Sequence, residues 1–104
     1  LVKLGAAKNT PKGGTYRLRD AETGEVRRTG RTNDLQRRQG EHGRQSETRD
    51  LDFEVDRRTD SYPAQRGREQ RIYDAHPEAD LNRRRPISSN NPRRDKYLRE
   101  GDGL

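Results

Sequence analysis

Large apolar side chains are so scarce in this chain that they limit what it can fold into. Leu, Ile, Val and Phe together account for 14 of the 104 residues, which is below the usual share for a folded domain. Disorder is therefore the first alternative to consider, because little apolar burial is available to offset the conformational entropy of the chain. If the chain folds, we expect one small domain with a modest core and marginal stability.

The charged residues favour an ordered chain with a polyanionic partner. The 24 basic and 18 acidic residues are mixed along the sequence, unlike the charges of a polyelectrolyte tail. The net charge of +6 favours binding to a polyanion through counterion release, and nucleic acid is the leading candidate. A membrane surface is the weaker candidate. No stretch carries a strong apolar face or approaches the length of a membrane span, so we expect no membrane role.

Several classes of site are excluded by what the sequence lacks. Without cysteine there is no disulfide, thiolate metal site or cysteine nucleophile. No glycine-rich phosphate loop and no metalloprotease helix with paired histidines occurs, and two histidines leave few places for a Ser-His-Asp triad. The chain has no methionine, starts at Leu1 and shows no signal peptide, so we expect a piece cut from a longer polypeptide.

Hydrophobic periodicity predicts the order β-β-α-β-α, followed by an irregular basic tail. We expect residues 1–14 to form a linker or arm, residues 15–100 the domain, and residues 101–104 a short tail. The predicted class is α+β, with a three-stranded, mainly antiparallel sheet flanked by helices.

Alternation defines the predicted strands. Residues 15–19 and 25–29 form a β-hairpin in which Tyr16 and Leu18 share one face. The third strand is predicted to have one buried and one solvated face. Its buried face would carry Leu51, Phe53 and Val55, and its solvated face Asp52, Glu54 and Asp56.

Capping signals define the predicted helices. Asn33 as the cap, with Gln36 three residues later, begins a helix that runs to about Ser46. Ser61 and Pro63 begin a second helix, which ends before Pro77 and which we expect to cover the sheet. Its apolar arc would carry Ala64, Ile72 and Ala75, extended by Tyr73. A weak helical segment is expected around Tyr97 and Leu98.

The first helix carries the most informative face. Leu35, Arg38, Gln39 and His42 share it by helical spacing. Burying Arg and His is costly unless they meet charge or hydrogen-bond partners, and a phosphate would satisfy both. The alternative is that this face is simply turned to solvent.

Two further residues could contribute chemistry. Tyr16 is an ordinary core residue by default, but its phenol could activate a water beside a cation. Glu69 lies at the edge of the second helix's apolar arc and could hold Mg²⁺ through oxygen. The alternative for Glu69 is a solvated surface carboxylate.

These residues lie within short motifs that together resemble one known family. The motifs are Gly14-Thr15-Tyr16, Arg28-Thr29-Gly30, Arg31-Thr32-Asn33-Asp34-Leu35-Gln36-Arg37-Arg38, His42, and Arg66-Gly67-Arg68-Glu69-Gln70. The pattern is similar to that of GIY-YIG nuclease domains and covers about residues 14–98. The stretch from Leu81 to Tyr97 resembles the tail of GIY-YIG-like toxin domains in bacterial polymorphic toxins.

The resemblance implies phosphodiester hydrolysis assisted by one divalent metal, Mg²⁺ or another cation such as Mn²⁺. It assigns metal binding to Glu69, charge neutralisation to Arg38, and activation of water to Tyr16 with His42. The tyrosine of the family's second motif is replaced by Arg28, so that tyrosine's role cannot be carried over. Candidate nucleic-acid contacts are Arg28, Arg31, Arg37, Arg83, Arg84 and Arg85, with a solvated surface as the alternative for each.

The resemblance further implies an excised, monomeric toxin domain, secreted or delivered to act in the cytoplasm of a target cell. DNA is favoured over RNA as its substrate, and an acidic immunity protein is the expected partner. Three alternatives stay open: a ribonuclease toxin on the same scaffold, a non-catalytic basic module that binds nucleic acid, and a structural interaction domain.

Overall fold

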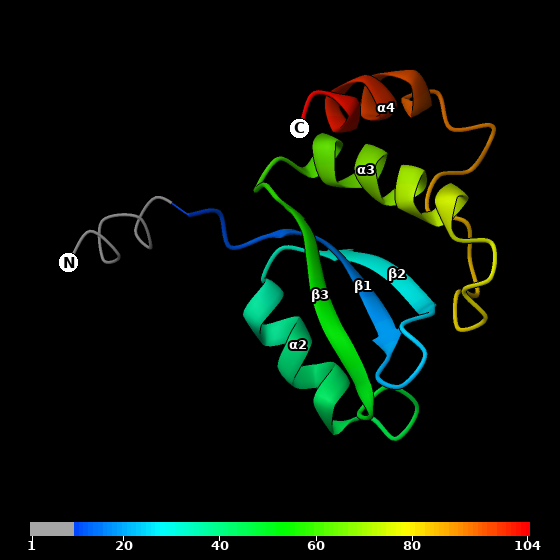
Figure 1. Ribbon diagram of the computed structural model, residues 1–104. Coiled ribbons are helices and arrows are strands. Elements are labelled where there is room, and N and C mark those ends of the chain that lie inside the picture. The colour runs from blue at the N-terminus through cyan, green and yellow to red at the C-terminus, as the bar shows by residue number, and fades with distance from the viewer. Residues whose placement is uncertain (1–9) are drawn as a thin grey trace.

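A computed structural model describes residues 10–104 of the chain. Residues 1–9, the larger part of the predicted linker, lie outside the described residues. From Thr10 onward the elements follow in the order β1, β2, α2, β3, α3 and α4, which confirms the predicted α+β class with a three-stranded antiparallel sheet (Figure 1). Among residues 10–104, none of the helices has the length and apolar character needed to span a membrane.

The sheet has strand order β2-β1-β3, with both pairs antiparallel. The strands are β1 (Gly14–Asp20), β2 (Val26–Thr32) and β3 (Leu51–Arg58), each longer than the sequence pattern predicts. Order begins before Thr15, because the amide of Gly13 donates to Asp60 and the carbonyl of Lys12 accepts from Leu35. The predicted linker boundary at residue 14 is therefore slightly late.

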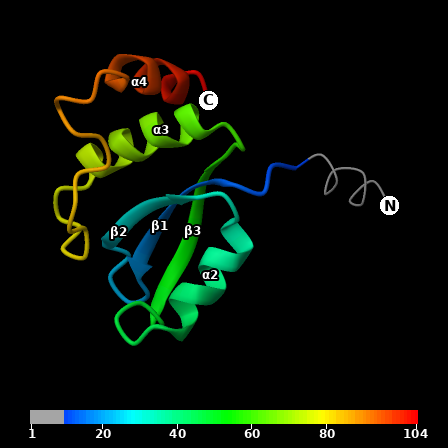
Figure 2. The same cartoon turned by 180° about the vertical axis from the view of Figure 1, so that it is seen from behind.

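One face of the sheet carries the main apolar core. Tyr16 and Leu18 lie on this face of β1, as predicted, and pack with Leu35 of helix α2 (Leu35–Arg44). Leu51 and Phe53 of β3 extend the cluster as partly buried side chains. The views in Figure 1 and Figure 2 show α2 lying along the sheet near β3 and β1.

The predicted division of β3 into a buried and a solvated face is wrong at its C-terminal half. Val55 is 37% exposed, whereas the side chain of Asp56 is only 2% exposed. Asp56 faces helix α3 and accepts hydrogen bonds from Thr15 and Arg68, with Arg17 at 2.9 Å. The second face of the sheet is therefore covered, and a buried ion cluster takes the place of an apolar layer there.

Helix α2 begins one residue later than its sequence pattern predicts. Asp34, and not Asn33, is the N-cap, because its side chain accepts from the amide of Arg37. Asn33 instead accepts from the Arg37 guanidinium. The helix ends at Arg44, two residues before Ser46, and the Gln45 amide then donates to the His42 carbonyl.

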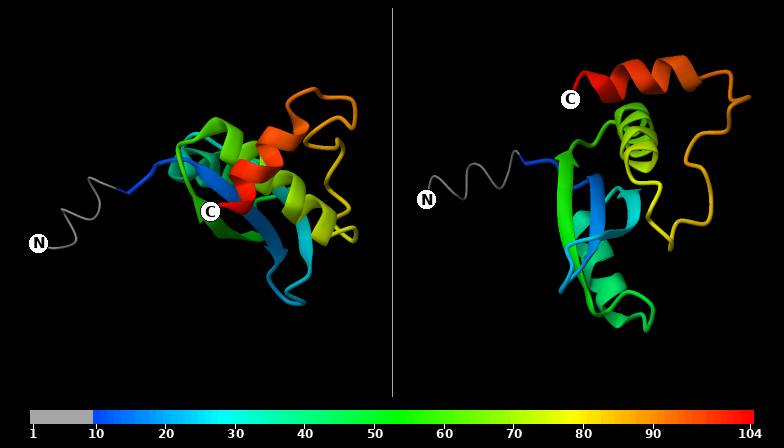
Figure 3. Two further views of the ribbon diagram at one scale, coloured as in Figure 1. Left: turned by 90° about the horizontal axis from the view of Figure 1, so that it is seen from above. Right: turned by 45° about the vertical axis from the view of Figure 1, so that its right-hand side comes forward.

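Helix α3 (Tyr62–Ala75) begins as predicted, with Ser61 as its N-cap. Ala64 and Ile72 are buried, but Ala75 is exposed, so the predicted apolar arc is one residue too long. The helix contacts β2 and β1 on the face opposite α2. The sheet is thus enclosed by one helix on each side, as Figure 3 shows from two directions.

Helix α4 (Arg94–Asp102) packs on α3, away from the sheet (Figure 3). Tyr97 and Leu98 form a second small core with Ile87. The two helices meet at Gly67 and Gly101, where a Cβ on Gly67 would overlap the carbonyl oxygen of Tyr97. Helix α4 extends to Asp102, so the predicted tail at 101–104 is partly helical. Gly101, within this stretch, is buried where the two helices cross.

We expect Gly67→Ala to lower the free energy of unfolding by about 1–3 kcal/mol, because the added methyl group forces α3 and α4 apart. Urea unfolding followed by circular dichroism measures this. Gly43→Ala is the matched control, since a Cβ on that exposed α2 glycine meets nothing within 4 Å. The control should gain up to about 1 kcal/mol from helix propensity. A Gly67 variant as stable as wild type would contradict the close crossing.

The segment between α3 and α4 covers part of the outer edge of β2. The amide of Leu81 donates to the carbonyl of Arg27, and the Asn82 side chain both accepts from the Thr29 amide and donates to the Thr29 hydroxyl. The predicted irregular tail thus satisfies part of the free edge of β2 without forming a strand.

Candidate active site

Tyr16 and His42 form a buried hydrogen-bonded pair. The Tyr16 hydroxyl lies 3.0 Å from Nε2 of His42, and each residue is 3% exposed. The Tyr16 ring stacks on Phe53 with centroids 4.8 Å apart. It extends across its β2 neighbour Gly30, where a Cβ would lie 2.5 Å from the phenolic oxygen. A glycine at this position therefore keeps room for the phenol.

Both members of this pair are uncharged at neutral pH. Burial first, and then the charges of Arg28 and Arg38, lower the pKa of His42 to about 4. Burial raises the pKa of Tyr16, although Arg38 and Arg28 act in the opposite direction. Nδ1 of His42 has no hydrogen-bond partner within residues 10–104. With the ring proton on Nδ1, Nε2 is free to accept the phenolic proton.

Both the backbone carbonyl and the ring of His42 are held in place. The hydroxyl of Thr48, which is 1% exposed, donates to the His42 carbonyl at 2.7 Å and fixes the last turn of α2. The other end of the residue, its ring, lies against Tyr16 and Phe53. The helix face carrying Leu35 and His42 is therefore turned into the protein, and the solvent alternative is wrong for these two residues.

Arg38 lies one helical turn before His42 and points toward the same region. Its side chain is 36% exposed, and its Nη1 lies 3.3 Å from Glu41. The Nε atom is buried and has no hydrogen-bond partner in the described part of the chain. Its positive charge reaches both Tyr16 and His42. The remainder of the guanidinium is partly exposed, and an incoming oxyanion could bind there.

Glu69 of α3 approaches this group from the opposite side of the sheet. Its side chain is 18% exposed, and burial raises the pKa of its carboxyl against the lowering effect of Arg31 and Arg66. It lies near enough for its charge to raise the pKa of Tyr16. Of the four residues, Tyr16 and His42 are in direct contact, whereas Arg38 and Glu69 act on Tyr16 through their charges. Arg38 is not among the charges that act on Glu69.

The oxygens of the Glu69 carboxylate are available to bind a cation. Its nearest charged partner is Nε of Arg31 at 3.9 Å, and it makes no direct hydrogen bond to any residue from 10 to 104. In that same part of the chain, no three His, Cys, Asp or Glu side chains lie together as a metal cluster. One carboxylate fits Mg²⁺, which commonly keeps several waters and takes its other ligands from substrate phosphates. The donor set is thus compatible with a hard divalent cation.

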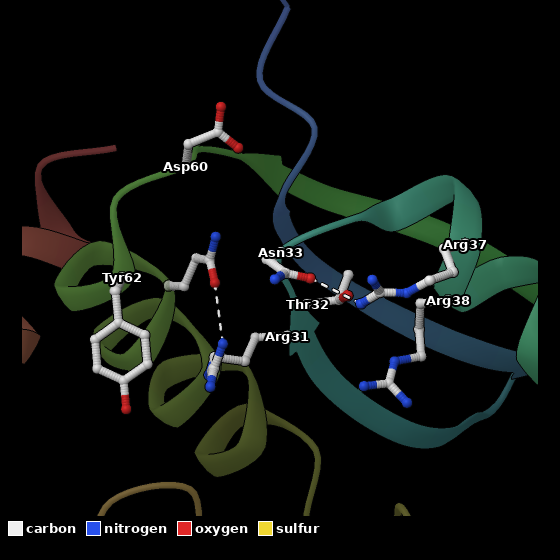
Figure 4. Close-up of a pocket in the computed structure, with 8 residues that line it drawn as sticks. Arg31, Thr32, Asn33, Arg37, Arg38, Asp60 and Tyr62 are labelled. Carbon is white, nitrogen blue, oxygen red and sulfur yellow. Dashed lines mark hydrogen bonds between the residues drawn. The ribbon is translucent and has the colours of Figure 1, made fainter.

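Arg38 and Glu69 each line a basic cavity, whereas Tyr16 and His42 line neither of the two. The first, of about 420 Å³, is lined by Arg31, Thr32, Asn33, Arg37, Arg38, Asp60, Tyr62 and Gln65 (Figure 4). The second, of about 320 Å³, is lined by Arg31, Arg66, Glu69, Arg84, Arg85 and Pro86. Arg31 lines both cavities, and Glu69 lines the second.

The candidate nucleic-acid contacts separate into groups. Arg31 and Arg37 line the first cavity, and Arg84 and Arg85 line the second. Arg28 lies near the Tyr16-His42 pair, where its charge affects both pKa values. Arg83 is not part of either cavity lining and instead pairs with Glu47 at 2.6 Å.

Sequence reasoning missed three residues of α3 that line these cavities. Gln65 is 2% exposed, accepts from Arg31 and donates to the Thr59 carbonyl, so it fixes the Arg31 guanidinium. Tyr62 and Arg66 lie on the same helix face. The spacing of Tyr62, Arg66 and Glu69 follows the i, i+4, i+7 rule, and this polar face was the available signal.

We expect Arg28→Gln to raise the pKa of His42, because it removes a positive charge that disfavours the imidazolium. An NMR titration of the His42 ring measures this, with the wild-type inflection at about pH 4. Arg37→Gln is the matched control, since Arg37 is exposed and its charge is not among those acting on His42. An unchanged inflection in the Arg28 variant would contradict this arrangement.

Comparison with known proteins gives no match of any kind. No family model, no curated protein and no solved structure is significantly similar to this chain.

Proposed function

We propose that this protein is a metal-dependent endonuclease that hydrolyses phosphodiester bonds of nucleic acid. The observation that carries the proposal is the buried hydrogen bond between Tyr16 and His42, with a phenol on which the charges of Arg38 and Glu69 both act. These are the groups needed to activate water, neutralise a phosphate and hold a cation.

The sequence resemblance supports the same class of enzyme. The likeness to GIY-YIG nucleases singles out four residues that up to 53 positions separate in the chain. Of these, Tyr16 is hydrogen-bonded to His42 and within reach of the charges of Arg38 and Glu69. Arg28 stands where the family's second motif has a tyrosine. Its charge helps to keep His42 neutral, so His42 is available as the second member of a proton-accepting pair.

In the proposed reaction a water attacks the phosphorus, one P–O bond forms, and the bond to the leaving oxygen breaks. The leaving oxygen then takes a proton from solvent water. The Tyr16 oxygen takes a proton from the water as its own proton passes to Nε2 of His42 over the existing 3.0 Å contact. Arg38 binds the non-bridging oxygens, whose negative charge grows in the transition state. A divalent cation at Glu69, Mg²⁺ or Mn²⁺, would supply Lewis-acid stabilisation of the phosphoryl and leaving oxygens.

Basic residues of the two cavities would bind the phosphate backbone. Arg31, Arg37, Arg84 and Arg85 are on this surface, and such contacts position the substrate without reading its sequence. We propose DNA as the favoured substrate and expect binding to weaken steeply as salt is raised. Arg28 would act nearer the reacting phosphate. A ribonuclease on the same scaffold is the alternative that the same residues allow.

The experiment that tests the enzyme is a cleavage panel. Purified protein is incubated with plasmid, linear duplex, total RNA and tRNA, in Mg²⁺, in Mn²⁺ and in chelator. We expect cleavage of at least one substrate that is lost in chelator. Binding to these substrates without any cleavage would favour a non-catalytic basic module.

We further propose that the chain is the toxin domain of a delivered bacterial effector, acting in the cytoplasm of a target cell. The resemblance to toxin-type domains and the net charge of +6 support this, and an acidic immunity protein is the partner that would mask the basic cavities. A pull-down from the producing strain should recover one specific acidic protein. Recovery of no such protein would count against the toxin role.

A further inference from the structure

The first cavity contains an exposed aromatic ring that the proposed chemistry does not use. Tyr62 is 46% exposed and lines the cavity together with Arg31. The Arg31 guanidinium carbon lies 4.7 Å from the ring centroid. Figure 4 shows these two side chains at one end of the cavity, with Arg37 and Arg38 at the other. An exposed tyrosine among arginines is an unusual use of one of only four tyrosines in the chain.

The ring is held firmly although it is exposed. Tyr97 meets it edge to face at a centroid distance of 6.1 Å. Arg66 donates to its hydroxyl and also lies over the ring, with its guanidinium carbon 5.5 Å from the centroid. Arg31 is in turn fixed by Gln65 at 3.1 Å. A ring and a guanidinium that are both fixed lose little entropy when a ligand stacks on them.

The position of this pair relative to Glu69 determines what it could contact. Arg31 touches Tyr62 and also lies 3.9 Å from the Glu69 carboxylate. A nucleotide whose phosphate is bound beside Glu69 would therefore place a neighbouring base near Tyr62. Aromatic rings flanked by arginines bind bases of single strands by stacking and cation–π contact.

We infer that Tyr62, together with Arg31, is a stacking platform for an unpaired nucleobase next to the scissile phosphate. The inference rests on the proposed nuclease function and narrows its substrate to single-stranded nucleic acid, or to a site with an unpaired nucleotide. Bases inside a continuous duplex are stacked on their neighbours, and their faces become available only when a base leaves the stack. The platform thus favours single strands over duplex, and stacking itself accepts DNA and RNA.

The test measures affinity in chelator, so that it does not depend on cleavage. Fluorescence anisotropy compares a short single strand, as DNA and as RNA, with a duplex of the same sequence. Tyr62→Ala should weaken single-strand binding about 5- to 150-fold, the loss typical of one stacked base, and leave duplex binding nearly unchanged. Tyr62→Phe and Tyr62→Trp keep a ring and should bind within about three-fold of wild type.

Tyr73→Ala is the matched control, because Tyr73 is a half-buried tyrosine of the same helix that lines a different cavity. Its variant should bind as wild type does. A single strand containing 2-aminopurine gives a second measurement: its fluorescence should be quenched by wild type and by Tyr62→Phe, but much less by Tyr62→Ala.

The outcomes separate the platform from the enzyme. Tyr62→Ala binding that equals wild type, or that falls equally for single strand and duplex, overturns the platform. If the DNA arm or the RNA arm alone shows the loss, that arm identifies the natural strand. Tyr62-dependent binding without cleavage of any substrate would defeat the nuclease and leave the platform standing. If Tyr62→Ala cleaves single strands as wild type does, the platform is overturned and the nuclease stands.

Discussion

Glu69→Gln is expected to lower the single-turnover cleavage rate by a factor on the order of 100 or more. The amide matches the carboxylate in shape but has no charge, so it binds a hard cation poorly. Since Glu69 is mostly covered and carries no hydrogen bond to any described residue, the substitution breaks no structural contact beyond the 3.9 Å approach to Arg31. Affinity for nucleic acid in chelator should stay within a few-fold of wild type.

Glu100→Gln is the control for the loss of one negative charge, because Glu100 is exposed on α4 away from the cavities. It should cleave at the wild-type rate. Near-normal cleavage by the Glu69 variant would remove this carboxylate from the active site, even if the protein still cleaves nucleic acid.

Asp56→Asn is expected to cost about 3–5 kcal/mol of the free energy of unfolding, which is large for a small domain. The substitution leaves Arg17 and Arg68 facing a buried neutral group in place of their common carboxylate. Urea denaturation of variant and wild type gives the difference. Glu54→Gln is the control, because its side chain is 42% exposed and its pairs with Arg17 and Arg19 should contribute about 1 kcal/mol or less.

The same carboxylate predicts how stability depends on acidity. Burial alone would raise the pKa of Asp56, but hydrogen bonds from Arg68 and Thr15 and the charges of Arg17 and Arg68 lower it to about 2. Its stabilising effect is complete above the unfolded value of 3.8 and is lost as the pH falls toward 2. In Asp56→Asn the acid-induced loss of stability between pH 4 and pH 2 should be smaller than in wild type. Equal losses in the two proteins would argue against a charged Asp56 in the fold.

The order of elements could be predicted from sequence because it depends on local signals. Alternation around Tyr16 and Leu18 predicted β1 and its core face, and Ser61 predicted the start of α3. The predicted ends of the strands were less accurate, because the end of a strand is set by its pairing with neighbouring strands. The α2 cap is an example: Asn33 and Asp34 are equivalent in sequence, and the Lys12 carbonyl that accepts from Leu35 becomes available only through the fold.

The burial of Asp56 could not be predicted, because alternation separates the faces of a strand without saying which face is covered. It assigned Val55 to the core and Asp56 to solvent, whereas α3 covers the face of Asp56. Helix α3, which lies later in the chain, covers this face, and its Arg68 together with Arg17 of β1 compensates the charge of the buried carboxylate. Where large apolar residues are scarce, such ion clusters replace them.

The residues of the candidate site are those that the resemblance to GIY-YIG nucleases implies, but their electrostatics could not be predicted from the sequence. The neutrality of His42 depends on burial by Phe53 and on Arg28 from a neighbouring strand. Tyr62 could not be identified from the apolar arc of α3, because it does not belong to that arc. Its role depends on a guanidinium that β2 supplies, and no local pattern contains that information.

A double-mutant cycle of Arg38→Ala and Glu69→Gln, read as single-turnover cleavage rates, tests most directly whether α2 and α3 act on one phosphate. If they do, each single variant loses a factor on the order of 100 or more, and the double variant is little slower than the worse single, as for groups that act as a unit. Losses that multiply in the double variant, or a wild-type rate in either single, would contradict a common site.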